Sequence, residues 1–405
     1  MMKLSRYPFT QIIIFFLGLT FFSCEKSEVA PDEIQNEYLI DYELLETIEA
    51  NQLKIFIGLF DQSVNTDVIR YDVEIYRVTY LTEYQGNMTE ASGFLCVPLD
   101  AKMVDFPIFL GFHASISSQS ESPSNFSNPI GTGLEFFASL GFIGVIPDYL
   151  GFGVSSQLFH PYLVKESVTQ VSTDMVRAAA EMMDELNQSY ERQLYLAGYS
   201  QGAYNTIATL SALENDGLLP DWEVAATAAG AGTYDLKFLT EQTLSKDNYA
   251  SPEVLSYLIW SYHNYYNLEG DAGTYFQEPY ASLIPSLFDG NNSLGEIGQS
   301  LTTDLTLLLQ PDFLSDLRNG EETVFYQILE ENSIPAWTAK SPINLLHAPQ
   351  DEVIGFENST EFVNDLEEAG SASITFTSLS APGHTQAAIP MLINTLFWLE
   401  NFRNI

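Results

Sequence analysis

The pentapeptide Gly-Tyr-Ser-Gln-Gly at positions 198–202 restricts the fold of this chain more than any other stretch. An apolar segment, 193–197, precedes it, and a segment rich in small and apolar residues, 203–210, follows it. This order predicts a strand, a sharp turn and a helix, with Ser200 at the tip of the turn. So tight a turn strains the backbone of the serine and requires small residues two positions to either side, which the two glycines supply. The stretch therefore indicates a serine nucleophile held between a strand and a helix.

Segments that suit strands alternate with segments that suit helices along most of the chain. Two meandering strands, followed by repeated strand–helix units, describe a mostly parallel sheet with helices on both faces. Together with the serine turn, this pattern predicts an α/β protein with the α/β-hydrolase fold. The expected strands are 73–82, 91–98, 106–112, 142–147, 193–197, 222–229, 343–347 and 373–379, and the expected helices are 41–59, 133–140, 168–186, 203–213, 359–369 and 385–402.

The segment 234–340 interrupts this alternation and is too long to be a simple loop. It contains an apolar and aromatic helical stretch at 254–266. We therefore predict a helical cap inserted into a hydrolase domain that covers residues 38–405. The aromatic residues can pack the cap onto the core or line an apolar acyl pocket, and both readings stay open.

One histidine suits the role of the catalytic base. In α/β-hydrolases the catalytic residues follow one another along the chain as serine, acid and histidine. Only His263, His347 and His384 come after Ser200. His263 lies in the predicted cap helix and His347 precedes the best acid, whereas His384 lies in the turn between the last strand and the last helix. His384 is therefore the predicted base.

The acid should follow the strand 343–347, and Asp351 does, with Glu352 as the reserve candidate. In the predicted reaction, Ser200 attacks the carbonyl carbon of an ester, and His384 takes and returns its proton. Asp351 fixes the tautomer of the imidazole and stabilises its positive charge.

The oxyanion that forms during such an attack needs backbone N–H donors. One donor comes from the residue after the nucleophile, which is Gln201, and another from the loop after the third strand of this fold. That loop is 111–115, and Ala114 is our candidate within it, although the sequence leaves open which of the five donates. We expect His113 to be a structural residue of this loop and not an acid–base group.

The N-terminal segment 1–23 has the features of a secretory signal peptide. Lys3 and Arg6 give it a positive start, and an apolar run at 12–22 follows. A transmembrane helix is the alternative, but the run is short and polar sequence follows it directly.

Residues 21–24 resemble the lipobox of bacterial lipoproteins, which predicts lipidation of Cys24 and attachment to the outer membrane or cell surface. The acidic segment 24–37 then forms a tether. The other cysteine, Cys96, is expected to be a buried apolar residue of a strand. A disulfide between Cys24 and Cys96 is the alternative.

The chain is strongly acidic, with a formal net charge of −39 over 405 residues. Such a surface repels nucleic acid and anionic phosphates, so neutral or cationic substrates suit it better, and we expect no nucleic-acid partner. Solubility outside the cell also accounts for the charge. No histidine and cysteine cluster has the spacing of a metal site, and we expect neither a metal nor a cofactor.

Three further motifs lead in order to the serine turn: Pro-Asp-Tyr-Leu-Gly-Phe-Gly at 147–153, His-Pro-Tyr at 160–162 and Asp-Met-Val-Arg-Ala-Ala at 174–179. With the pentapeptide, they resemble the secretory lipase family of the α/β-hydrolase superfamily. The resemblance implies hydrolysis of carboxylic esters, often acylglycerols, with a helical cap closing an acyl tunnel. The chain departs from the family pattern at Ala203, where many members have a further glycine.

The resemblance also implies that Asp148 lies at the oxyanion site. It follows the strand 142–147, and sheets of this type carry their sites at the carboxyl ends of strands. A charged carboxylate would repel an oxyanion, so this role requires a protonated, buried Asp148. In the alternative, Asp148 is ionised and stabilises the turn at 150–153.

Taken together, the residues predict a serine carboxylic ester hydrolase, a lipase or esterase, that acts through an acyl-enzyme on neutral, acyl-lipid-like esters. A peptidase or a polysaccharide acyl-esterase could use the same Ser–Asp–His set and is the alternative. A third hypothesis is a catalytically silent surface lipoprotein that binds a ligand through the cap, but such a protein has no need of a strained serine.

Overall fold

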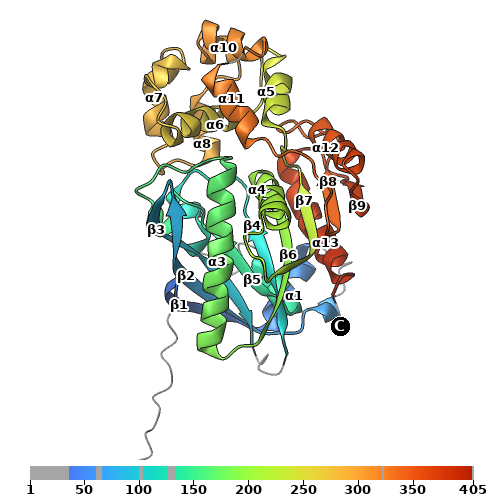
Figure 1. Ribbon diagram of the computed structural model, residues 1–405. Coiled ribbons are helices and arrows are strands. Elements are labelled where there is room, and N and C mark those ends of the chain that lie inside the picture. Colours follow the sequence, from blue (N-terminus) through green and yellow to red (C-terminus); the bar gives the residue numbers. More distant parts are fainter. Residues whose placement is uncertain (1–35, 61–65, 100–103, 126–132, 322, 404–405) are drawn as a thin grey trace, which may run out of the picture. The chain divides into compact units, whose positions relative to one another are not determined.

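A mostly parallel sheet forms the centre of the fold (Figure 1). The computed structural model describes residues 36–60, 66–99, 104–125, 133–321 and 323–403. The predicted signal peptide, Cys24 and the tether up to residue 35 lie outside the described residues. Within the described ranges the strands are β1 (Leu39–Ile48), β2 (Val73–Tyr84), β3 (Asn87–Pro98), β4 (Phe106–Phe112), β5 (Ile143–Pro147), β6 (Tyr190–Tyr199), β7 (Glu223–Gly230), β8 (Ile343–His347) and β9 (Ile374–Ser378).

The strands lie in the order β1-β2-β3-β5-β4-β6-β7-β8-β9. The pairs from β1 to β5 are antiparallel, and all pairs from β5 across to β9 are parallel. Every residue of β4, β5 and β8 is buried, as expected for parallel strands that helices cover on both faces. The carboxyl ends of these strands meet at one edge of the sheet, so the loops that follow them are gathered there. The predicted α/β-hydrolase architecture is confirmed.

Helices pack on both faces of the sheet and complete two hydrophobic cores. On one face lie α3 (Lys165–Leu186), α4 (Gln201–Ser211) and α12 (Glu357–Glu368). On the other lie α1 (Ala50–Phe60), α2 (Leu134–Leu140) and α13 (His384–Glu400). Figure 1 shows α3 and α4 in front of the strands. Cys96 on β3 is fully buried in the second core, where it packs as an apolar residue.

The N-terminal part of the fold differs from the expectation of one helix over 41–59. Residues 39–48 form β1, an edge strand that pairs antiparallel with β2, and α1 begins only at Ala50. The apolar residues Leu44, Leu45 and Ile48 have a spacing that suits a helix. Pairing with an existing sheet edge outweighs that local preference, because the backbone groups of β2 offer hydrogen bonds that the sequence pattern does not reveal.

The chain between β7 and β8 is helical and forms a separate layer above the sheet in Figure 1. Its contacts place it over the loops at the carboxyl ends of the strands. The Tyr249 hydroxyl donates to the carbonyl oxygen of Val353, after β8, at 3.1 Å, and Ser261 Oγ donates to that of His160, after β5, at 2.9 Å. The helices of this insertion are α5 (Leu236–Leu244), α6 (Pro252–Tyr265), α7 (Tyr280–Leu287), α8 (Leu294–Ser300), α9 (Leu305–Leu308), α10 (Pro311–Arg318) and α11 (Val324–Asn332).

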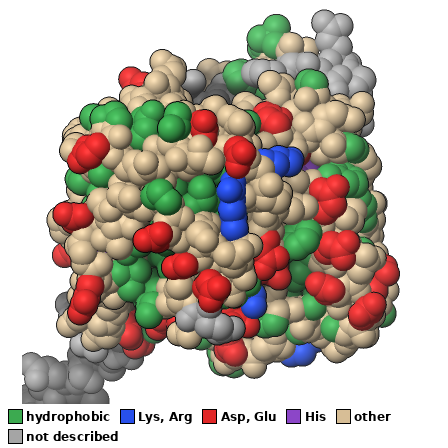
Figure 2. All heavy atoms as spheres, turned by 90° about the horizontal axis from the view of Figure 1, so that it is seen from above, with side chains coloured by type: hydrophobic (Ala, Val, Ile, Leu, Met, Phe, Trp, Pro, Cys, Tyr) green, Lys and Arg blue, Asp and Glu red, His purple; other side chains and the backbone are tan. Residues whose placement is uncertain are grey.

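Figure 2 looks onto the outer face of this insertion. Acidic side chains are spread over the face among apolar ones, and basic side chains are few, which agrees with the net charge of the sequence. No helix in the described part of the chain combines the length and the apolar character that a membrane span requires.

Candidate active site

Ser200 lies at the junction of β6 and α4 in a strained backbone conformation. Its φ of 58° and ψ of −120° fall in a region that residues other than glycine rarely adopt. The turn is closed by close contacts that exclude side chains on both glycines. A Cβ atom on Gly198 would collide with the carbonyl oxygen of Gly202, and one on Gly202 with that of Phe112. The predicted turn is therefore present, and its two glycines are required by contact as well as by conformation.

Three side chains from distant parts of the chain form one hydrogen-bonded line. His384, the first residue of α13, places Nε2 at 2.9 Å from Ser200 Oγ. Its Nδ1 lies at 2.6 Å from Asp351 Oδ2. A carboxylate can only accept, so Nδ1 carries the hydrogen and Nε2 presents its lone pair to the serine hydroxyl. The structure thus brings Ser200, His384 and Asp351 together in the order expected from the sequence.

The Asp351 carboxylate is fully buried and accepts from donors on both oxygens. Oδ1 accepts from the backbone N–H groups of Val353 and Ile354 at 2.9 and 2.8 Å. Oδ2 accepts from His384 and also lies 3.2 Å from His347 Nε2. Burial alone would raise the pKa of Asp351, but the hydrogen bonds from these histidines and from Ile354 hold it below its usual value. Asp351 is therefore an ionised partner for His384.

Glu352, the reserve candidate for the acid, holds a different atom of the same histidine. Its Oε2 accepts from the backbone N–H of His384 at 3.1 Å, whereas the ring of His384 donates to Asp351. The two neighbouring acids thus accept hydrogen bonds from His384, one from the ring and one from the backbone N–H. Tyr199 makes a third hydrogen bond to this residue, because its hydroxyl donates to the carbonyl oxygen of His384 at 2.5 Å.

Gln201 is the first residue of α4, so its backbone N–H has no acceptor within the helix. Its side chain is buried, and Nε2 donates to His160 Nε2 at 2.9 Å. His160 in turn donates from Nδ1 to the carbonyl oxygen of Leu150 at 2.7 Å. Burial lowers the pKa of His160 to about 3, so the ring is neutral and can accept from Gln201. This chain of contacts fixes the residue beside Ser200.

The loop after β4 runs beside the serine turn, since the carbonyl oxygens of Phe112 and His113 border Gly202. His113 packs its ring on Tyr149 with 4.0 Å between ring centroids, and its Nε2 lies 3.2 Å from the carbonyl oxygen of Asp148. These contacts suit a structural role for His113. Ala114, the next residue, is exposed, and its part in an oxyanion site stays a prediction.

Asp148 is completely buried. Its carboxyl group is hydrogen-bonded to two serines, Ser92 and Ser124. Oδ2 accepts from Ser92 Oγ at 2.6 Å, and Oδ1 accepts from the backbone N–H of Ser124 at 2.7 Å. Ser92 Oγ also accepts from the backbone N–H of Val154 at 3.0 Å. Burial raises the pKa of Asp148, and the two serines partly offset this. The carboxyl thus joins β3 to two neighbouring turns, and its part in an oxyanion site stays a prediction.

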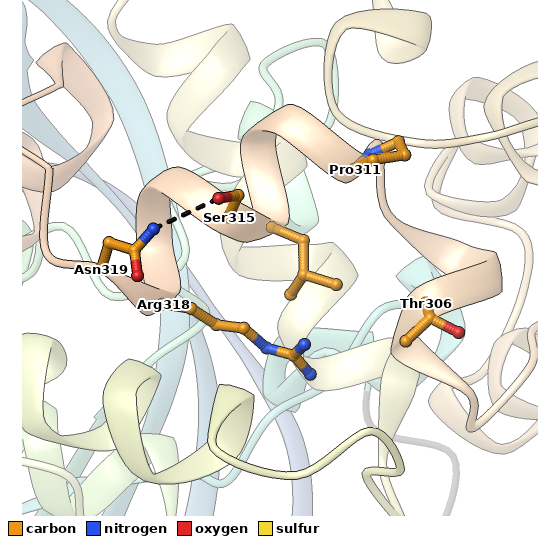
Figure 3. Close-up of a pocket in the computed structure, with 6 residues that line it drawn as sticks. Thr306, Pro311, Ser315, Arg318 and Asn319 are labelled. Atoms are coloured by element: carbon orange, nitrogen blue, oxygen red, sulfur yellow. Dashed lines mark hydrogen bonds between the residues drawn. The ribbon is translucent and has the colours of Figure 1, made fainter.

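One cavity lies within the insertion and another lies at its border with the sheet domain. One is a cleft of about 420 Å³ in the insertion itself (Figure 3). Its arginine, Arg318, is already bound to Asp247 Oδ1 at 2.9 Å. The other, of about 250 Å³, lies between the loop after β5 and the insertion, and His160, Tyr257 and Phe288 line it. Among the described residues, no group of three or more His, Cys, Asp or Glu side chains is placed to hold a metal ion.

Sequence reasoning missed three residues that hold the site together. The position of His347 before the acid argues against a role as base, but it shares the oxygen of Asp351 that His384 uses. In the sequence, His160 stands out only as part of the His-Pro-Tyr motif, and Tyr199 only as part of the serine turn. The spacing of His347, four residues before the acid, is a signal that could have identified it, whereas the contact of His160 with Gln201 depends on tertiary structure.

The fold and this geometry define a member of the α/β-hydrolase class. The model of the secretory lipase family matches residues 136–404, more than half of the chain. The chain therefore belongs to the secretory lipase family and is a carboxylic ester hydrolase of the lipase or esterase type, as the sequence motifs predicted.

Solved structures give the same architecture. A protein of Legionella pneumophila superposes with a TM-score of 0.82 at 26% identity, over 91% of this chain and 99% of the other. The rice cell wall degrading esterase LipA from Xanthomonas oryzae gives 0.77 at 23% identity, over 90% and 99%. Candida antarctica lipase A in its closed state gives 0.65 at 14% identity, over 90% and 81%. No curated protein matches the sequence.

Proposed function

We propose that the chain hydrolyses neutral carboxylic esters through an acyl-enzyme on Ser200. The observation that carries this proposal is the hydrogen-bonded line from Ser200 Oγ through His384 to the buried Asp351, at 2.9 and 2.6 Å. A serine is a weak nucleophile until an adjacent base removes its proton, and a base is effective only when a third group holds its tautomer.

In the first half of the reaction, Ser200 Oγ attacks the carbonyl carbon while its proton moves to His384 Nε2. The imidazolium that forms is stabilised by Asp351, which stays ionised. The negative oxygen of the tetrahedral intermediate binds the backbone N–H of Gln201 and a second N–H from the 111–115 loop, with Ala114 as our candidate. The intermediate collapses when the alcohol leaves with the proton of His384.

In the second half, water attacks the acyl-enzyme and gives its proton to His384. The proton then returns to Ser200 Oγ as the carboxylic acid leaves, so the enzyme is regenerated without a cofactor. We propose a structural role for Asp148, which supports the loops around the site through Ser92 and Ser124.

The proposed substrate is an ester with an apolar acyl group and no negative charge. The net charge of −39 disfavours anionic substrates. We propose that residues 234–340 act as a cap, because this insertion contacts the loop after β5 and the loop after β8, which carries Asp351. It also contains many buried aromatic side chains. Peptides and acylated polysaccharides are the alternative substrates.

The proposed substrate class is tested with p-nitrophenyl esters from acetyl to palmitoyl, together with peptide anilides and acetylated xylan. We expect ester hydrolysis with a preference for chains longer than acetyl. Ser200→Ala and His384→Ala should each lower turnover by several orders of magnitude, and the double variant should be no worse, because the two act as one unit. Turnover of anilides or xylan above that of the esters would favour the alternatives, and an active Ser200→Ala would exclude the mechanism.

Membership of a secretory family suggests export, and we propose that it proceeds through the signal peptide 1–23 with lipidation at Cys24. Several acyl chains, at about 0.8 kcal/mol per buried methylene, give a stable membrane anchor. Fractionation of cells is the measurement: wild type should be membrane-bound, and Cys24→Ala should be released or unprocessed. If both are equally soluble after normal processing, the protein is not a lipoprotein.

A further inference from the structure

His347, the last residue of β8, is completely buried beside the proposed acid. Its Nε2 lies 3.2 Å from Asp351 Oδ2 and 3.1 Å from the carbonyl oxygen of Ile354. Its Nδ1 lies 2.8 Å from Ser359 Oγ, and the ring of Phe356 packs against it at 5.6 Å between centroids. Every polar atom of this side chain is thus engaged.

These partners select one form of the imidazole. Both groups facing Nε2 are acceptors, so Nε2 must carry a hydrogen. A neutral imidazole has one N–H, so Nδ1 then accepts from the hydroxyl of Ser359. A neutral His347 with its hydrogen on Nε2 satisfies all three partners, and no positive charge is needed.

We propose that His347 is a positioning residue that holds Asp351 Oδ2 by its Nε2–H and shares this oxygen with His384. The proposal rests on the proposed function, because it gives His347 a role through the Ser200–His384–Asp351 line. A second donor on Oδ2 has two effects. It restrains the rotation of the carboxylate, and it disperses the negative charge that would otherwise act on His384 alone.

The second effect bears on the pH at which the enzyme works. His384 must be neutral to accept the proton of Ser200, and a more concentrated charge on Asp351 stabilises its imidazolium form. In the part of the chain that the structure describes, Glu352 also contacts His384 at its backbone N–H, and the ring of Tyr199 lies 5.2 Å away. Neither changes when His347 is replaced. Removing His347 should therefore extend the inactive, protonated range of His384 to higher pH.

The experiment compares pH profiles of kcat/KM for wild type, His347→Leu and His347→Gln. In His347→Leu the acid limb should move up by roughly half a pH unit to one unit, while KM on the plateau stays within about twofold of wild type. In His347→Gln the amide N–H can replace Nε2–H, so the limb should return toward wild type. His263→Leu, the same change in the insertion, is the matched control and should leave the profile unmoved.

A purely structural role for His347 would lower the melting temperature without moving the acid limb, and that result overturns the proposal. A shift of the acid limb to lower pH in His347→Leu also overturns the proposal. Should His347→Leu fail to fold, ¹⁵N spectra of histidine-labelled wild type still decide, because the proposal requires a neutral His347 with its hydrogen on Nε2 throughout the active pH range. A hydrogen on Nδ1, or an imidazolium, overturns it. These outcomes leave the proposed function standing, which fails only if wild type lacks Ser200-dependent ester hydrolysis.

Discussion

Replacement of His160 by glutamine should change how the stability of the protein depends on pH. His160 is buried between Leu150 and Gln201, and its neutral ring donates from Nδ1 and accepts at Nε2. Burial lowers its pKa from 6.5 to about 3, although the hydrogen bond to the carbonyl oxygen of Leu150 acts in the opposite direction. Glutamine fills a similar volume and does not titrate.

The sign of the effect follows from where the protons bind. Between pH 6.5 and about 3, His160 is protonated in the unfolded chain and neutral in the folded one. The unfolded state binds more protons in this window, so the free energy of unfolding falls as the pH falls, by up to about 1.4 kcal/mol per pH unit. From pH 7 to pH 4.5 the loss amounts to about 2 to 3 kcal/mol. Above pH 7 the contribution is complete and constant.

Urea unfolding of both proteins at pH 7 and pH 4.5 measures this difference. His160→Gln should be the less stable protein at pH 7, where it lacks the native contacts, and its deficit should shrink by about 2 to 3 kcal/mol at pH 4.5. His263→Gln is the control and should give a smaller change of the same sign, because His263 is only half-buried and burial lowers its pKa. A deficit that is the same at both pH values would refute a neutral, desolvated His160.

Two further predictions concern the acid and the serine turn. Asp351→Asn should give ester turnover between those of Ser200→Ala and wild type, whereas Glu352→Gln should stay near wild type because its amide oxygen still accepts from His384 N–H; the reverse order in a kinetic assay would make Glu352 the acid. Gly202→Ala adds a Cβ that collides with the carbonyl oxygens of Phe112 and His113, so it should lose about 1–3 kcal/mol of stability along with activity. Gly295→Ala in α8, where nothing lies within 4 Å, is its control in thermal unfolding, and equal melting temperatures would contradict the contact argument.

The parts of the fold that sequence predicted well are those whose signals are local. Small residues at fixed offsets identify the serine turn, and each buried parallel strand appears in the sequence as a short apolar run. Because the order of catalytic residues is constant in this fold, the loops after β8 and β9 could be searched for an acid and a base, and the structure brings Asp351 and His384 together there.

What the sequence does not reveal depends on partners that lie far away along the chain. Residues 39–48 have an apolar spacing that predicts a helix, and only their pairing with β2 makes them a strand. The partners of Asp148 are hidden from the sequence in the same way. Its position after a buried strand suits a role at the oxyanion site, which stays a prediction, and its burial agrees with that role. The two donors that engage it lie 56 and 24 residues away, and neither is marked by a pattern in the sequence.

The histidines near the proposed active site fall into two groups, one that the sequence identifies and one that it does not. A histidine that follows the last strand and begins the last helix, such as His384, can reach the serine at the carboxyl edge of the sheet, so its position in the sequence selects it. A histidine within a buried strand or loop must instead find partners for both ring nitrogens, because an unpaired buried polar atom costs about 1–3 kcal/mol. His347 and His160 meet this requirement by binding the side chains next to the reacting groups, Asp351 and Gln201. Both buried histidines therefore lie beside residues of the proposed active site, where polar partners for their ring nitrogens are available.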